Sequence, residues 1–308
     1  MIKNKKKLRL RKEVIISIPI ALCVATFLTI LIITNNKALS VKTTPKVVET
    51  SYTVNELTEE GKAKIEGFIN YLENAHEKRV KDNTIIYYAQ KFKLNVSKTL
   101  QIAHELTNNY EDEEYNKTFT IAPDSYKAKV GTFNSMEAGM VYFVRDLYRY
   151  PNRYGTTIEE IRTSEEPDQT KIIVDGTTYL KNGFTYEQYL GHICDLYGID
   201  KSIALAISYH ESGILKSGLF MKSNNVGGMR GYAGWMKFPT LEAGIIGYVI
   251  SLRAIINNNG INLNAPNGIS DLSSIYVNGH PNNPSDHWTS KVTYFRNKIN
   301  EKDLFTIN

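Results

Sequence analysis

The sequence contains only two cysteines, Cys23 and Cys194, and this scarcity excludes a disulfide-stapled fold. Cys23 lies inside a long apolar run near the N-terminus, whereas Cys194 lies in a segment with helical periodicity. The two thiols cannot pair, so the chain beyond the apolar run must be stable through packing alone. Cys194 falls on a predicted packing surface, which gives no setting for a reactive thiolate.

Beyond its N-terminus the chain also lacks an excess of positive charge. The formal net charge is +5, but residues 1–12 supply seven of the 37 Lys and Arg residues, which leaves 30 cations facing 32 acids. This balance provides no broad basic surface, and we expect no nucleic-acid partner.

Motifs for common cofactors and nucleophiles are missing as well. The sequence has no phosphate-binding loop, no serine-nucleophile elbow and no dinucleotide fingerprint. A zinc-protease helix needs a second histidine one turn after its His-Glu pair, and Ile214 and Asn108 occupy the two relevant positions. We therefore expect no metal and no cofactor.

What the N-terminus does contain is a long apolar run. Val14 to Thr34 comprises 21 residues with Pro19 as its only proline, enough for a helix to cross a bilayer of about 30 Å. The preceding basic residues favour the cytoplasmic side, which sends the remainder of the chain outside. A signal peptide cleaved near residues 38–40 is the alternative, although the run exceeds the usual signal core of about 7–15 residues.

These features predict a single-pass protein of the cell membrane with extracytoplasmic C-terminal domains. Residues 1–12 form the cytoplasmic tail, 13–34 the transmembrane anchor, with the membrane contact at 14–34, and 35–52 a polar linker that contains Pro45.

Downstream of the linker, helical patterns dominate, so the fold class is mainly α. Thr185 and Gln188 have the spacing of a capping box before a helix that extends to Tyr197. Asp200 is placed to cap a second helix that ends at Glu211. A third helix, from about 241 to 256, is almost wholly apolar and should be buried.

An internal repeat organises this helical part. Residues 133–147 match residues 238–252 at an offset of 105, and the same offset pairs residues 94–102 with 199–207 without a gap. We infer two related helical domains, at about 53–165 and 176–303. The first lacks the glycine loops of the second and places Leu106 opposite Glu211, although a one-residue slip would align His104-Glu105 with His210-Glu211.

Glu211 is the candidate catalytic residue of the second domain. Ser212-Gly213 should end its helix, so partial burial and the negative end of the helix dipole would both raise the pKa of the carboxyl group. A carboxylic acid that stays protonated near neutral pH can protonate the leaving oxygen of a glycoside. The Asn and Gly residues that follow could approach a sugar closely, while Tyr232 and Trp235 offer aromatic faces.

The order of these residues resembles a known family. Glu211-Ser212-Gly213, Lys216-Ser217, Asn224-Asn225 and the run 227–231 (GGMRG) are similar to the signature of the endo-β-N-acetylglucosaminidases of glycoside hydrolase family 73, in the lysozyme-like superfamily of bacterial peptidoglycan hydrolases. The resemblance continues through Phe238 and Glu242-Ala243-Gly244 to a distal segment with Tyr276 and Trp288, and covers roughly residues 190 to 300.

The resemblance implies a lysozyme-like catalytic domain at 176–303, a degenerate lysozyme-like copy at 53–165, and peptidoglycan glycan strands as substrate, cut at N-acetylglucosamine. It makes Glu211 the general acid. Its implied substrate-binding residues are Ser212, Asn224, Asn225, Gly227, Gly228, Tyr276 and Trp288, and the aromatic faces of Tyr232 and Trp235 add these two residues to the predicted substrate-binding set.

A second catalytic carboxylate is not evident. Glu242 is the only acid between Ser212 and Gly244, and its counterpart Glu137 occurs in the copy without a site, so Glu242 is interpreted as structural. The substrate's own N-acetyl group could then attack the anomeric carbon, giving a hydrolase, or its 6-hydroxyl could attack, giving a lytic transglycosylase. Asp271 and Asp286 are distant candidates for a base.

Two other functional classes are alternatives to a glycosidase. A non-catalytic cell-wall binding or assembly protein would keep the lysozyme-like cleft without turnover. An amidase or endopeptidase acting on peptide stems finds no Cys-His pair or metal set in the sequence. The bond that is cut, the role of the first copy, the processing of the anchor, protein partners and the oligomeric state are not encoded in any recognisable motif.

Overall fold

The computed structural model describes residues 59–111, 133, 135–164, 166–231, 233–277, 285–302 and 304–305. The predicted tail, membrane anchor and linker at 1–52 lie outside these residues. Among the helices that are described, none has the length and apolar character needed to cross a membrane. Residues 63–308 form one compact unit.

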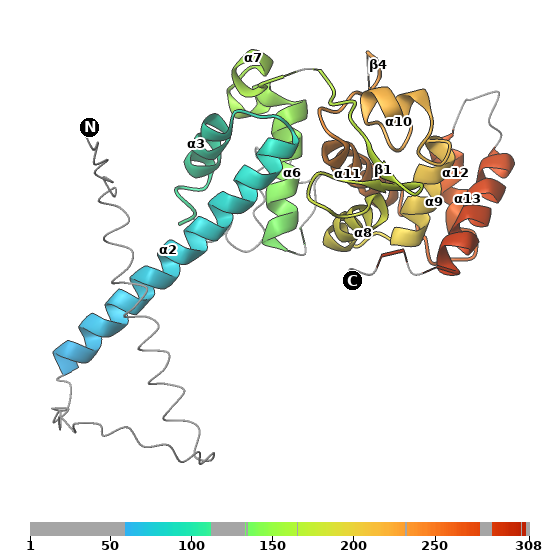
Figure 1. The fold of residues 1–308 in the computed structure, drawn as a ribbon. Helices are drawn as coiled ribbons and strands as arrows, with labels where there is room; N and C mark the ends of the chain where they lie inside the picture. Colours follow the sequence, from blue (N-terminus) through green and yellow to red (C-terminus); the bar gives the residue numbers. More distant parts are fainter. Residues whose placement is uncertain are drawn as a thin grey trace, which may run out of the picture. The chain divides into compact units, whose positions relative to one another are not determined.

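The described chain is mainly helical, as predicted (Figure 1). Its N-terminal helices and turns are α2 (Glu59–Lys91), α3 (Val96–Leu106), α6 (Met136–Arg149), the 3-10 turn η1 (Pro151–Tyr154) and α7 (Ile158–Ile161). The remaining helices are α8 (Tyr186–Tyr197), α9 (Lys201–Glu211), α10 (Gly218–Ser223), α11 (Leu241–Asn258), α12 (Gly268–Tyr276) and α13 (Ser285–Asn300). Two short antiparallel hairpins pair β1 (Ile172–Val174) with β2 (Thr177–Tyr179), and β3 (Arg230–Gly231) with β4 (Gly234–Trp235).

The predicted helix starts are confirmed at the level of their caps. The Thr185 hydroxyl accepts from the Gln188 backbone N–H while the Gln188 side chain accepts from the Thr185 N–H, which completes the capping box of α8. The Asp200 carboxylate accepts from the backbone N–H of Ile203 and so caps α9. The third predicted helix is α11, which extends two residues beyond the expected end.

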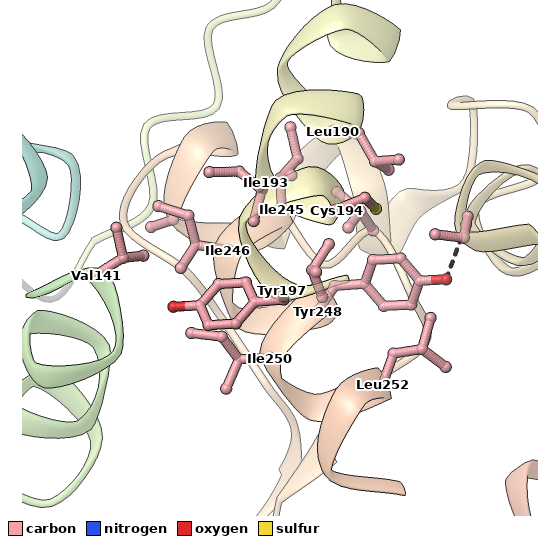
Figure 2. Packing of buried hydrophobic residues seen from close by; sticks show 14 of the residues in the cluster. Val141, Leu190, Ile193, Cys194, Tyr197, Ile245, Ile246, Tyr248, Ile250 and Leu252 are labelled. Atoms are coloured by element: carbon pink, nitrogen blue, oxygen red, sulfur yellow. Dashed lines mark hydrogen bonds between the residues drawn. The ribbon is translucent and has the colours of Figure 1, made fainter. Parts of the chain in front are cut away.

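Buried residues of α2, α6, α8, α9 and α11 form the core, and Figure 2 shows the part of it where residues of α6, α8 and α11 pack together. Ile193 and Cys194 of α8 are fully buried, as are Ile245 and Ile246 of α11, so α11 is the buried helix that its composition predicted. The Tyr248 hydroxyl donates to the carbonyl of Ala204, which ties α11 to α9. Buried residues of both predicted copies belong to this single cluster.

The repeat offset of 105 is visible in the backbone. Helices α3 and α9 begin 105 residues apart, and so do α6 and α11, each pair with a side-chain cap at the equivalent position. The connection before α3 contains Lys93 in a left-handed conformation with a φ of 48°, and the equivalent residue before α9 is Gly198 with a φ of 64°. The boundaries of two separate domains stay a prediction, but the two halves share this succession of elements.

The same offset extends through the turns that end α3 and α9. Residues 108–110 all have positive φ, and so do residues 213–215. The hydroxyl of Thr107 accepts from the backbone N–H of Tyr110, just as the Ser212 hydroxyl accepts from that of Leu215. The backbone therefore supports the alignment without a slip, in which Leu106 corresponds to Glu211.

Candidate active site

Glu211 is the last residue of α9, and an unusual turn takes the chain away from it. Three successive residues, Gly213, Ile214 and Leu215, have φ values of 58°, 54° and 60°, in the left-handed region. This region is unfavourable for the β-branched Ile214. The turn is held by the Ser212 hydroxyl and by a bond from the Ile214 N–H to the Tyr209 carbonyl at 2.8 Å. The predicted helix stop is confirmed, and Ser212 stabilises it from a buried position.

The Glu211 carboxylate is partly buried and has one direct side-chain partner among the described residues. The indole Nε1–H of Trp288, on α13, donates to Glu211 Oε1 at 2.8 Å. Burial raises the pKa of Glu211, and the hydrogen bond from Trp288 opposes this rise without cancelling it. The pKa shift has the expected direction and burial is its cause, while the expected contribution of the helix dipole stays a prediction.

The loop that contains Gly227 and Gly228 lies directly against this carboxylate. A Cβ on Gly228 would lie 2.5 Å from Glu211 Oε2, and the φ of Gly228 is +60°. A Cβ on Gly227 would lie 2.1 Å from the ring of Tyr248. Both positions therefore favour glycine, and glycine backbone lies beside Glu211 Oε2.

Tyr276 and Trp288 complete the group. The Tyr276 hydroxyl donates to the carbonyl of Gly227, and the ring centroids of Tyr276 and Trp288 are 5.4 Å apart. Trp288 is fully buried, so it presents no free face for stacking, and its indole N–H holds the Glu211 carboxylate in place. The structure thus brings together Glu211, Gly227, Gly228, Tyr276 and Trp288 from four separate segments of the chain.

Asn224 and Asn225 are placed beneath the loop. Both are buried, and both amide hydrogens of each side chain are engaged with backbone carbonyls. The Asn225 oxygen also accepts from the Met229 N–H at 2.8 Å, while the Asn224 oxygen accepts from Lys171 Nζ at 2.8 Å. The observed contacts of these asparagines shape the loop, and a direct contact to sugar stays a prediction.

The two predicted stacking residues are not part of this group. Trp235 is 49% exposed on β4, where its ring lies under the guanidinium of Arg230 at 4.4 Å. Tyr232, in the connection between β3 and β4, lies outside the described residues. A stacking role for either stays a prediction.

No acidic side chain of the described segments contributes to the pKa of Glu211. Glu242 is buried and forms an ion pair with Lys91 at 2.9 Å, in agreement with its interpretation as structural. Asp271 is exposed and accepts from Asn267, and Asp286 is exposed in the first turn of α13. The described residues also contain no cluster of His, Cys, Asp and Glu suited to a metal ion.

A cavity of about 600 Å³ adjoins the Gly227-Gly228 loop, and sequence reasoning missed the residues that distinguish it. Its wall carries four arginines: Arg145, Arg149, Arg153 and Arg230. The first three recur at intervals of four residues, a spacing that could have drawn attention to them.

The chain was compared with known proteins, and no protein-family model, curated protein or solved structure matches it. The functional interpretation therefore rests on the geometry of the site and on the motif resemblance alone.

Proposed function

We propose that this chain is a membrane-tethered peptidoglycan hydrolase that cleaves the glycan strand at N-acetylglucosamine, with Glu211 as its general acid. The observation that supports the proposal most directly is the carboxyl group itself. It combines burial, a raised pKa and a single opposing hydrogen bond, and glycine backbone lies beside its second oxygen. A protonated carboxyl group in this setting is suited to donate to a glycosidic oxygen as that bond breaks.

With Glu211 as the one acidic group at the site in the described part of the chain, the proposed reaction proceeds by attack from within the substrate. The proton of Glu211 passes to the leaving oxygen, and the bond from that oxygen to the anomeric carbon breaks. In the hydrolase, the carbonyl oxygen of the neighbouring N-acetyl group attacks the anomeric carbon, and water opens the ring that forms. Glu211, now a carboxylate, accepts the proton released by water, which restores the acid.

A lytic transglycosylase is the alternative within the same chemistry. There the 6-hydroxyl of the sugar attacks the anomeric carbon, its proton passes to the Glu211 carboxylate, and an anhydro end forms without water. This route also needs only one acidic group, which agrees with the surroundings of Glu211 among the described residues.

The test is digestion of purified sacculi by the full chain in mild detergent, followed by mass spectrometry of the released fragments. We expect reducing N-acetylglucosamine ends from a hydrolase, or anhydro ends from a transglycosylase. Glu211→Gln should abolish either product, and Glu105→Gln, which changes an exposed glutamate of α3, should not. If the unmodified protein releases neither kind of end, the assignment as a glycosidase is wrong.

A non-catalytic cell-wall binding protein is the rival from another class. The lack of a second acid near Glu211 in the described chain is the observation that favours it. Sedimentation with sacculi, compared with loss of turbidity, distinguishes the hydrolase from the binding protein. Binding without loss of turbidity, unchanged in Glu211→Gln, would support the binding protein.

A further inference from the structure

The cavity beside the Gly227-Gly228 loop carries a marked excess of positive charge. Among the described residues that line it, four are arginines and Asp146 is the one acid. Asp146 is almost fully buried and already engaged, because Arg153 donates to both of its oxygens at 3.1 Å and Tyr154 donates to it at 3.0 Å. The cavity therefore has three more positive than negative groups.

The remaining arginines are not neutralised within the described chain. Arg145 is only 8% exposed, its hydrogen bond goes to the neutral hydroxyl of Ser251, and its nearest carboxylate oxygen is 3.8 Å away on the engaged Asp146. Arg149 and Arg230 contact aromatic rings, those of Tyr150 and Trp235, and no described carboxylate lies within ion-pair distance of either. Guanidinium groups held in this way are suited to bind an anion, and their planar donors match a carboxylate well.

The cavity shares lining residues with the candidate active site. Gly227, Gly228 and Tyr276 line it, and the same three residues surround Glu211 or its partner Trp288. A polymer bound at Glu211 would therefore place a neighbouring group in the arginine-lined cavity.

The chemistry of the polymer indicates what that group is. A glycan of N-acetylated sugars whose lactyl groups are in amide linkage has no charge along its backbone, and the anionic groups of peptidoglycan are the carboxylates of the attached peptides. We propose that the arginine-lined cavity binds carboxylates of the peptide stems on a glycan strand that lies at Glu211. This inference rests on the proposed substrate, and it gives the first repeat a role, because Arg145, Arg149 and Arg153 all belong to residues 53–165.

Binding can be measured without turnover in the Glu211→Gln background. The probes are soluble glycan strands with intact stems, the same strands after an amidase has removed the stems and the lactyl carboxylates so released have been converted to methylamides, and a glycerol-phosphate oligomer as a different source of anionic groups. We expect the stem-bearing strands to bind at least about tenfold more tightly than the stripped strands, as charge-assisted hydrogen bonds to two arginines would allow.

The test variant adds Arg149→Gln and Arg230→Gln, which leaves the buried Arg145 in place. It should lose about tenfold in affinity for stem-bearing strands and show a weaker dependence on salt, with unchanged affinity for stripped strands. Arg79→Gln, on the exposed face of α2, is the matched control and should change neither affinity. Thermal unfolding of each variant checks that the fold is retained.

Three results would overturn the inference: no preference for stems, an equal loss of affinity for both kinds of strand, or tighter arginine-dependent binding of the glycerol-phosphate oligomer. An arginine-dependent preference for stems in a protein that never cleaves sacculi would support the inference while refuting the catalytic proposal. Failure to bind either strand would refute both.

Discussion

Replacement of Asn225 with alanine tests whether this residue supports the loop or contacts a sugar directly. The Asn225 side chain donates to the carbonyls of Met229 and Met236 at 2.8 and 3.0 Å, and accepts from the Met229 N–H at 2.8 Å. Asn225 is 1% exposed, so water cannot replace these bonds without rearrangement of the loop.

The expected loss of stability follows from the hydrogen-bonding groups that lose their partner. Three hydrogen bonds at about 1 kcal/mol each give a loss of about 3 kcal/mol. The Met229 carbonyl keeps its bond from the Met236 N–H at 3.0 Å, but the Met229 N–H and the Met236 carbonyl lose the bonds that Asn225 supplies. An unsatisfied buried donor adds about 1 kcal/mol or more, so we expect Asn225→Ala to lower the free energy of unfolding by about 3–5 kcal/mol.

The assay is thermal unfolding of the full chain in mild detergent, followed by near-ultraviolet circular dichroism. For a unit of this size the loss corresponds to a fall in Tm of about 10 °C. Asn267→Ala is the matched control, because that exposed side chain makes one surface hydrogen bond, to Asp271, and its loss should cost under about 0.5 kcal/mol. A fall in Tm below about 2 °C, together with lost affinity for glycan, would refute the reasoning and make Asn225 a direct ligand.

Three further outcomes are expected. Trp288→Phe removes the hydrogen bond that lowers the pKa of Glu211, so the alkaline limb of the kcat/KM profile on peptidoglycan should move to higher pH. The control Trp235→Phe should leave this limb in place. A move to lower pH in Trp288→Phe would contradict this assignment. Because the pKa of Glu211 is raised above 4.5 in the native state, the native protein binds this proton more tightly than the unfolded chain, and stability falls as pH rises from 4.5 through the native pKa. Glu211→Gln should therefore be more stable than the unmodified protein at pH 8 but not at pH 4. Unfolding free energies of the two proteins that differ more at pH 4 than at pH 8 would exclude this explanation. Lys93→Gly should raise the free energy of unfolding by about 0.5–1 kcal/mol, because Lys93 has a φ of 48° and the equivalent residue of the second half is Gly198. The control Lys93→Ala should give no such gain. Equal effects of both changes would show that the side chain, not the backbone conformation, is responsible.

The loop at residues 224–228 shows which features of the site can be predicted from the sequence and which require the structure. The Asn and Gly residues of the loop predict backbone that can approach a ligand closely, because glycine and asparagine tolerate left-handed conformations; that approach stays a prediction. Its position directly against Glu211 was not encoded locally, since the clash that requires glycine at position 228 comes from a carboxylate 17 residues earlier in the chain.

The sequence by itself determined the helices, their caps, the repeat offset of 105 and the position of Glu211 at a helix end. The helices, their caps and the helix end at Glu211 depend on interactions between residues at most five positions apart, such as the bond from the Ile203 N–H to Asp200, and such interactions leave a readable pattern. The repeat offset is read by aligning two segments of the same sequence. Only the tertiary structure decided that Trp288, 77 residues away, holds the Glu211 carboxylate, and that arginines of the first repeat lie beside the glycine loop of the second. Those contacts arise from the packing of helices against one another, which depends on the shape of the whole core and not on any short stretch of sequence.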